Sequence, residues 1–260
     1  MLCKLANGRF FLSQALLHYT AAALSDRGRK RSSNEDAYGL APQDGVFVLC
    51  DGMGGAVAGE IASAMAVDEM LRLLAGRPPE MPIPDAARQA VAAANEAIYT
   101  RAVRSHKLRG MGTTLVALVA DAEQAWMVNV GDSRGYRLRA GRLSQITVDH
   151  SLVEEQVRSG QMNEAEARRS PLRNVITRAL GTQASVNADL FPLDPQAGDL
   201  FLLCSDGLTR EISDVLLQSL LSLDLAAEEM CRRLVRAANQ AGGHDNITCV
   251  VVKADPPAGS

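Results

Sequence analysis

The chain has 260 residues, enough for one large domain or two small ones. Hydrophobic residues make up 47% of it and charged residues 22%, which is the balance of a soluble globular protein. The formal net charge of −3 argues against a main role in nucleic-acid binding, which needs a broad basic surface. No apolar run reaches the ~18 uncharged residues of a membrane-spanning helix, so we expect no membrane partner.

Residues 1–20 are expected to form an N-terminal extension that leads into a first strand. Lys4 and Arg9 precede a short apolar stretch, which gives the segment a faint likeness to a signal peptide. Ser13, Gln14 and His18 interrupt that stretch, and a small-residue cleavage site is missing, so we do not interpret it as one.

The five cysteines include no Cys-x-x-Cys pair. Cys50, Cys204 and Cys249 lie inside apolar, strand-like runs, where a free thiol behaves as a small hydrophobic side chain. This pattern is typical of a protein in a reducing cytosol rather than of a disulfide framework, and it predicts a cytoplasmic location.

The first half of the chain reads as a strand followed by two helices. The apolar run from Phe47 to Cys50 predicts a strand, and apolar residues at helical spacing predict a helix over Glu60 to Leu74. Pro78 to Pro84 breaks the chain, and Asp85 is placed to cap a second helix that runs to about Val103.

From Met111 the hydrophobic period changes from helical to strand-like. Residues 113–120 and 125–133 read as a hairpin with a polar turn at 121–124. Residues 135–147 alternate between apolar and charged side chains around a second turn at 140–141, as antiparallel strands with one buried face do.

The second half begins with a polar excursion over residues 149–178. A buried strand is expected over 199–208, followed by helices at about 214–221 and 225–241 and a closing strand at 246–254. The pattern predicts one α+β domain over residues 21–253, with antiparallel strands in the middle, helix pairs outside and a tail at 254–260.

Three aspartates stand next to the expected strands. Asp51 and Asp206 each end an apolar run and precede glycine, and Asp245 lies just before the closing strand. Taken singly, each reads more readily as a turn or cap residue, because Asp and Gly are common in tight turns. If the strands are neighbours, however, these acids meet at one rim together with Glu35 and Asp36 of the sequence NED.

Clustered carboxylates repel one another unless a cation neutralises them. Oxygen ligands without accompanying His or Cys suit Mg²⁺ or Mn²⁺, and an acid shared by two ions would hold a bridging water for attack at phosphorus. Gly52 has no side chain, so its carbonyl oxygen is free to face an ion. The four histidines are scattered without the spacing of a zinc site, which gives a zinc enzyme or a Ser-His-Asp triad little support.

A basic segment, Arg27 to Arg31, lies just ahead of Glu35 and Asp36. It reads equally well as a solvated or nonspecific nucleic-acid-binding face and as the source of an arginine that pairs with a phosphate group.

Seven motifs in order resemble the PPM family of metal-dependent type 2C serine/threonine protein phosphatases, and specifically its compact bacterial members. The resemblance extends over nearly the whole chain, from about Ala21 to Lys253. The motifs are RGRKRSSNED, DGMGG, GMGTTLVA, VGDSRGYR, the segment from Asp149 to Gly181, CSDGL and GGHDN. The resemblance implies a central β-sandwich of two antiparallel sheets flanked by helices, with metal ions in a cleft at one edge, which agrees with the fold expected from the pattern of elements.

The resemblance also implies roles for individual residues. Asp51 resembles the acid that bridges two Mn²⁺ or Mg²⁺ ions, and Asp206 and Asp245 resemble its partners on the first ion. Asp36, with the carbonyl of Gly52, resembles the second site.

Further positions carry roles by the same resemblance. Glu35 would contribute directly or through water, Arg31 would grip the substrate phosphate, and Asp132 resembles a ligand of a weaker third ion. The segment Ser151 to Leu172 resembles a variable flap that affects substrate choice. Met53 stands where animal members have a histidine proposed as the general acid, so the sequence leaves the proton donor unassigned.

The function implied is metal-dependent hydrolysis of phosphoserine and phosphothreonine in proteins, by a monomeric signalling enzyme that opposes a serine/threonine kinase. Two alternatives remain. A catalytically inactive phosphoprotein-binding module would be expected to lose metal-binding acids, yet all four aspartates are present. A general phosphomonoesterase for small metabolites is harder to distinguish from a protein phosphatase, because a shallow cleft admits either a small metabolite or a phosphoprotein.

Overall fold

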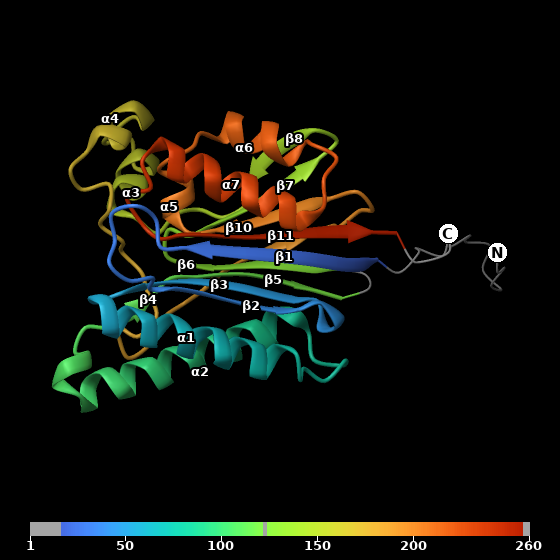
Figure 1. Ribbon diagram of the computed structural model, residues 1–260. Coiled ribbons are helices and arrows are strands. Elements are labelled where there is room, and N and C mark those ends of the chain that lie inside the picture. Colours follow the sequence, from blue (N-terminus) through green and yellow to red (C-terminus); the bar gives the residue numbers. More distant parts are fainter. Residues whose placement is uncertain (1–16, 122–123, 257–260) are drawn as a thin grey trace.

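The computed structural model describes residues 17–121 and 124–256 (Figure 1). Most of the expected N-terminal extension, the middle of the turn predicted at 121–124 and the end of the predicted tail lie outside the described residues. None of the helices in the described part of the chain is long and apolar enough to cross a membrane.

Two antiparallel sheets stack to form the centre of the molecule. The first has the strand order β1 (His18–Asp26), β11 (Ile247–Asp255), β10 (Leu200–Cys204), β7 (Arg134–Arg139) and β8 (Arg142–Gln145). The second has the order β2 (Asp36–Ala41), β3 (Val46–Met53), β5 (Leu115–Ala120), β6 (Ala125–Val130) and β9 (Asp189–Leu193), and the short β4 (Gly112–Thr113) pairs with the end of β3.

Helices cover both outer faces of this sandwich (Figure 1). α1 (Ala56–Leu74) and α2 (Ile83–Arg104) lie on the second sheet, with the short 3-10 helices η1 (Pro42–Asp44) and η2 (His106–Leu108) in neighbouring connections. α5 (Asp206–Thr209), α6 (Asp214–Leu221) and α7 (Ala227–Ala241) lie on the first sheet. The predicted α+β fold, with a central β-sandwich between helix layers, is confirmed.

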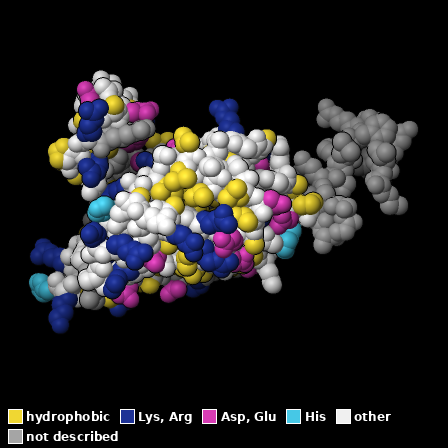
Figure 2. Space-filling model, turned by 45° about the horizontal axis from the view of Figure 1, so that its top comes forward, with side chains coloured by type: hydrophobic (Ala, Val, Ile, Leu, Met, Phe, Trp, Pro, Cys, Tyr) yellow, Lys and Arg dark blue, Asp and Glu magenta, His cyan; other side chains and the backbone are white. Residues whose placement is uncertain are grey.

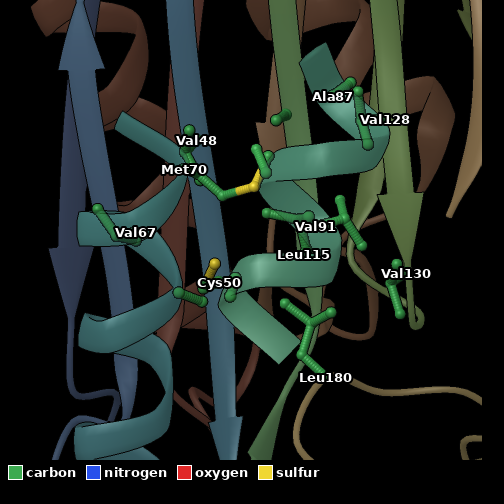
Figure 3. Packing of buried hydrophobic residues seen from close by; sticks show 14 of the residues in the cluster. Val48, Cys50, Val67, Met70, Ala87, Val91, Leu115, Val128, Val130 and Leu180 are labelled. Carbon is green, nitrogen blue, oxygen red and sulfur yellow. The ribbon is translucent and has the colours of Figure 1, made fainter. Parts of the chain in front are cut away.

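Three apolar layers hold these elements together. Side chains of β3 alternate between two of them: Phe47 and Leu49 face the other sheet, whereas Val48 and Cys50 face the helices. Figure 3 shows Met70 of α1 close to Val48 in the outer layer. Because both faces of the strand are buried, its sequence is a continuous apolar run rather than an alternating one.

The predicted flap segment contains two short helices, α3 (Leu152–Arg158) and α4 (Glu164–Arg169), at one end of the sandwich. The side chains of Glu164, Glu166 and Arg169 are exposed. In Figure 2 this end of the molecule forms a lobe that carries side chains of both charges. Segments with few buried apolar side chains can unfold locally at a lower free-energy cost than the rest of a domain.

Several element boundaries differ from those predicted. α1 begins at Ala56 rather than Glu60, directly after Gly54 and Gly55, whose φ angles are 115° and 89°. α2 begins before Asp85, because Pro84 is accepted in the first turn, where its missing N–H is not needed.

At the C-terminus, β11 ends at Asp255, one residue beyond the predicted closing strand. Asp255 pairs with His18 of β1, and Thr20 Oγ1 donates a hydrogen bond to Asp255 Oδ2 at 2.8 Å. Hydrogen bonding to β1 therefore makes β11 longer than its apolar residues alone predict.

Candidate active site

Asp36 and Asp51 face each other across the hydrogen-bonded pair of β2 and β3. Asp36 begins β2, and Asp51 lies near the end of β3, after its buried apolar run. Directly opposed residues in an antiparallel pair have Cβ atoms about 5 Å apart, so the sheet itself brings these two carboxylates together.

Two hydroxyl groups bind Asp36, one from β11 of the other sheet and one from the residue that follows β10. Ser205 Oγ and Thr248 Oγ1 donate to Asp36 Oδ2 at 2.9 and 2.6 Å. Asp36 Oδ1 is buried and has no hydrogen-bond partner among the described residues. Sequence reasoning missed Ser205 and Thr248, although each lies within three residues of a predicted metal ligand.

The backbone of Asp51 is fixed by two threonines. Thr114 Oγ1 accepts from the Asp51 N–H at 2.9 Å, and Thr113 Oγ1 donates to the Asp51 carbonyl at 2.9 Å. The Thr114 N–H donates to the same carbonyl at 2.8 Å. The predicted strand at 113–120 is therefore interrupted at Thr114, where these bonds hold the end of β3 in position.

Gly52 is required by close packing. A Cβ at this position would lie 2.2 Å from the Gly59 carbonyl oxygen and 2.6 Å from that of Glu35. The Gly52 N–H also donates to the Glu35 carbonyl at 3.1 Å. Glu35 itself is buried, and its side chain lies against Gly59 of α1, so its position next to the site is set by packing.

Asp206 and Asp132 reach the same rim from the loops after β10 and β6. Asp206 is the first residue of α5, and its Oδ2 lies against the guanidinium group of Arg210. Arg210 Nη2 also lies 3.3 Å from Asp132 Oδ2. Asp206 Oδ1 is buried without a hydrogen-bond partner in the described part of the chain. Arg210 was not singled out from the sequence, although its i, i+4 spacing from Asp206 on a helix was a usable signal.

Asp245 and Arg31 meet at the exposed side of the site. Arg31 Nη2 lies 2.8 Å from Asp245 Oδ2, and the Arg31 side chain is 49% exposed. Asp245 Oδ1 accepts from the N–H of Asn246 at 2.8 Å. The predicted phosphate-binding arginine is thus beside a predicted metal ligand and open to solvent.

Asn246 joins the loop after β1 to the loop before β11. Its Oδ1 accepts from the Glu35 N–H at 2.9 Å, and its Nδ2 donates to the carbonyls of Arg27 and Ser33 at 3.0 and 2.8 Å. This side chain, also missed from the sequence, therefore positions Glu35, and the Asn246 backbone N–H separately binds Asp245.

Burial, with repulsion among neighbouring acids, raises the pKa of four carboxyl groups in the site. Burial raises the pKa of Asp36 to about 6, with a further contribution from Asp245 and an opposing one from the two hydroxyl donors. Burial and the neighbouring acids raise the pKa of Asp51 and of Asp206 well above the usual range, and burial raises that of Asp132. The site therefore lacks the positive charge that would let all of its acids ionise.

The donor set fits a divalent cation of the Mg²⁺ or Mn²⁺ type. Asp36 Oδ1 and Asp206 Oδ1 are buried carboxylate oxygens that accept no hydrogen bond from any described residue, and hard oxygen donors of this kind are the preferred ligands of these ions. Over residues 17–121 and 124–256, no three His, Cys, Asp or Glu side chains are already grouped around a single cation position. Arg31 and Arg210 lie among the acids and partly neutralise them instead.

Comparisons with known proteins identify the family of this chain. The family model described as protein phosphatase 2C matches residues 26–251. The serine/threonine phosphatase stp of Listeria monocytogenes is 38% identical over 241 residues, which span 89% of this chain and 94% of that protein.

Solved structures show the same likeness. The serine/threonine phosphatase PstP/Ppp of Mycobacterium tuberculosis has 38% identity and a TM-score of 0.86, covering 92% of this chain and 100% of that one. The catalytic domain of PstP in complex with two manganese ions has 37% identity and a TM-score of 0.84, covering 92% of this chain and 99% of that one. The chain therefore belongs to the protein phosphatase 2C family.

Proposed function

We propose that this chain is a Mn²⁺- or Mg²⁺-dependent phosphatase that removes phosphate from phosphoserine and phosphothreonine in proteins. One observation carries the proposal: acids from both sheets, Asp36 and Asp51 from one and Asp206 and Asp245 from the ends of the other, lie at one rim. Relatives of this chain are named serine/threonine phosphatases, and the catalytic domain of one of them, PstP, has been solved with two manganese ions.

The proposed ligands divide between two cation positions. Asp51 would be shared, with Asp206 and Asp245 completing one position and Asp36 with the Gly52 carbonyl completing the other, and Glu35 would assist nearby. Divalent cations at these positions would neutralise the carboxylates, polarise the phosphoryl group and activate water. Arg31, half-exposed beside Asp245, would bind the phosphoryl oxygens and orient the substrate.

The proton donor to the leaving alcohol is not Met53. Met53 lies opposite Gly112 at the junction of β3 and β4, and a thioether carries no transferable proton. A group other than this side chain would protonate the leaving oxygen.

The biological setting is part of the same proposal. Phosphorylated proteins would be the substrates, and a serine/threonine kinase would phosphorylate the residues that this monomeric, single-domain enzyme resets. Cys50, Cys204, Cys231 and Cys249 are buried free thiols, which supports a reducing, cytoplasmic environment.

Hydrolysis of a phosphothreonine peptide tests the function. We expect turnover with Mn²⁺, loss of turnover with a chelator and a loss of at least about 100-fold in Asp206→Asn, because this change removes an ionic ligand. Asp224→Asn, at an exposed position, is the matched control and should retain wild-type turnover.

Two outcomes would point elsewhere. Turnover that survives both chelation and Asp206→Asn would exclude the metal-dependent mechanism. A kcat/KM for small phosphomonoesters that exceeds the value for phosphopeptides would identify a general phosphomonoesterase instead.

A further inference from the structure

Arg210 sits between two carboxylates of the rim. Its Nη2 lies 3.3 Å from Asp132 Oδ2 and also contacts Asp206 Oδ2, and its Nη1 lies 3.9 Å from Asp245 Oδ2. The Asp132 and Asp206 side chains are only 10% and 14% exposed. The Arg210 side chain is itself 30% exposed, so its guanidinium group lies at the edge of the site, in contact with carboxylates that are largely buried.

Two connections hold Arg210 in this position. Its backbone N–H donates to the Asp206 carbonyl at 2.8 Å, which closes the turn of α5 and places both side chains on one side. The next residue, Glu211, accepts from the His244 N–H at 2.9 Å. This second bond ties the end of α5 to the loop that carries Asp245.

The contacts of Arg210 leave one oxygen of Asp206 available. Oδ2 is taken by the guanidinium group, whereas Oδ1 is buried and has no hydrogen-bond partner within the described ranges. Asp206 can therefore keep its contact with Arg210 and still offer an oxygen to a cation on its other side.

We propose that Arg210 is a built-in cation that takes the place of a third metal ion between Asp132 and Asp206 and so limits the chain to two ions. The proposal rests on the proposed metal-dependent function. A guanidinium group keeps its charge at any physiological pH, and a divalent ion bound by the same two carboxylates would have to displace it or lie within a few ångströms of it. In this chain Asp132 is accordingly an anchor for Arg210 rather than a metal ligand.

Equilibrium dialysis against Mn²⁺ with elemental analysis tests the proposal, because it counts bound ions directly and does not depend on turnover. We expect two ions per chain in the wild type and three in Arg210→Met, which frees both carboxylates. Asp132→Asn added to Arg210→Met should return the count to two. Arg210→Lys, which keeps the charge, should stay at two, and Arg232→Met, at an exposed pair on α7, is the matched control.

The remaining results separate this proposal from the proposed function. Three ions in the wild type, or two in both the wild type and a folded Arg210→Met, overturn the role of Arg210. Arg210→Met leaves Asp132 and Asp206 without their counter-ion, so in chelator it should lower the thermal midpoint by more than Arg232→Met does. If it does not, the role of Arg210 is also overturned. No bound Mn²⁺ in any variant, with no phosphopeptide hydrolysis by the wild type, would instead reject the metal-dependent function.

Discussion

The two oxygens of the Asp36 carboxylate have different surroundings: one is hydrogen-bonded within the protein, and the other is buried. Asp36 Oδ2 accepts two hydroxyl hydrogen bonds, whereas Oδ1 is buried and unpaired as far as the described residues show. A buried oxygen left without a donor costs on the order of 1–3 kcal/mol, and more when it is charged. An unpaired buried carboxylate oxygen of this kind can bind a ligand that the chain does not itself supply, such as a cation.

Asp36→Asn tests the cost of this arrangement in the metal-free protein. Burial raises the pKa of Asp36 from 3.8 to about 6. Between these two pH values the folded state therefore keeps a proton on Asp36 that the unfolded state has released. Stability from this group is therefore complete below 3.8 and is lost as the pH rises through about 6. At pH 7 the loss is on the order of 3 kcal/mol, since each pKa unit corresponds to about 1.4 kcal/mol.

We expect Asp36→Asn to be more stable than the wild type at neutral pH in chelator and to show a flatter stability profile over this pH window. Urea unfolding at a series of pH values, with chelator throughout, provides the measurement. Asp224→Asn should follow the wild-type profile, and parallel profiles for all three proteins would contradict the prediction.

Arg31→Ala tests the exposed side of the site. The Arg31 side chain is half-exposed and reaches Asp245, so its removal should weaken phosphate binding without displacing the buried acids. We expect KM for a phosphothreonine peptide to rise about 10-fold or more and kcat to fall by less, as for a group that binds ground and transition states alike. Arg29→Ala, an exposed neighbour in the same loop, serves as the control. An unchanged KM in Arg31→Ala would remove this residue from the substrate site.

At the scale of elements, the sequence allowed the long apolar strands to be predicted, together with the acids at their ends. The runs before Asp51 and Asp206 are buried on both faces, so their composition alone indicates strands. β9 was missed because it is an edge strand that contains Pro192 and has no fully buried side chain in its pattern. Ser205 and Thr248 could not be predicted as partners of Asp36, because their contact depends on how two sheets stack.

Asn246→Ala tests how one side chain joins two loops. Asn246 makes three hydrogen bonds to backbone groups of the segment 27–35, and a methyl group would leave all three without that partner. We expect a loss of about 2–4 kcal/mol in unfolding free energy, from about 1 kcal/mol or more per bond. Urea denaturation measures it, with Asn174→Ala at an exposed position as the control. Equal effects of the two changes would show that the loops are held by other contacts.

At the scale of the whole molecule, the candidate site is the place where the two sheets share a charged boundary. Asp36 and Asp51 belong to strands of one sheet, and Asp206 and Asp245 adjoin strands of the other. The apolar layer between the sheets contains Phe47 and Phe201, both fully buried, and holds the sandwich together without any ion. Cations bound at the rim would add a second link between the same two halves and remove the repulsion among the acids.

Mn²⁺ should therefore stabilise the whole fold rather than one loop. A ligand that binds only the folded state adds about 2.7 kcal/mol at a free concentration of 100 times its Kd. We expect scanning calorimetry to show a single transition in chelator that moves to higher temperature as Mn²⁺ is added, because acids from both sheets gain the same counter-ions. Asp51→Asn, which removes the acid assigned to both ions, should lose most of this shift, whereas Asp224→Asn should keep it. A midpoint independent of Mn²⁺, or a shift retained in Asp51→Asn, would place the bound ions somewhere other than the boundary between the sheets.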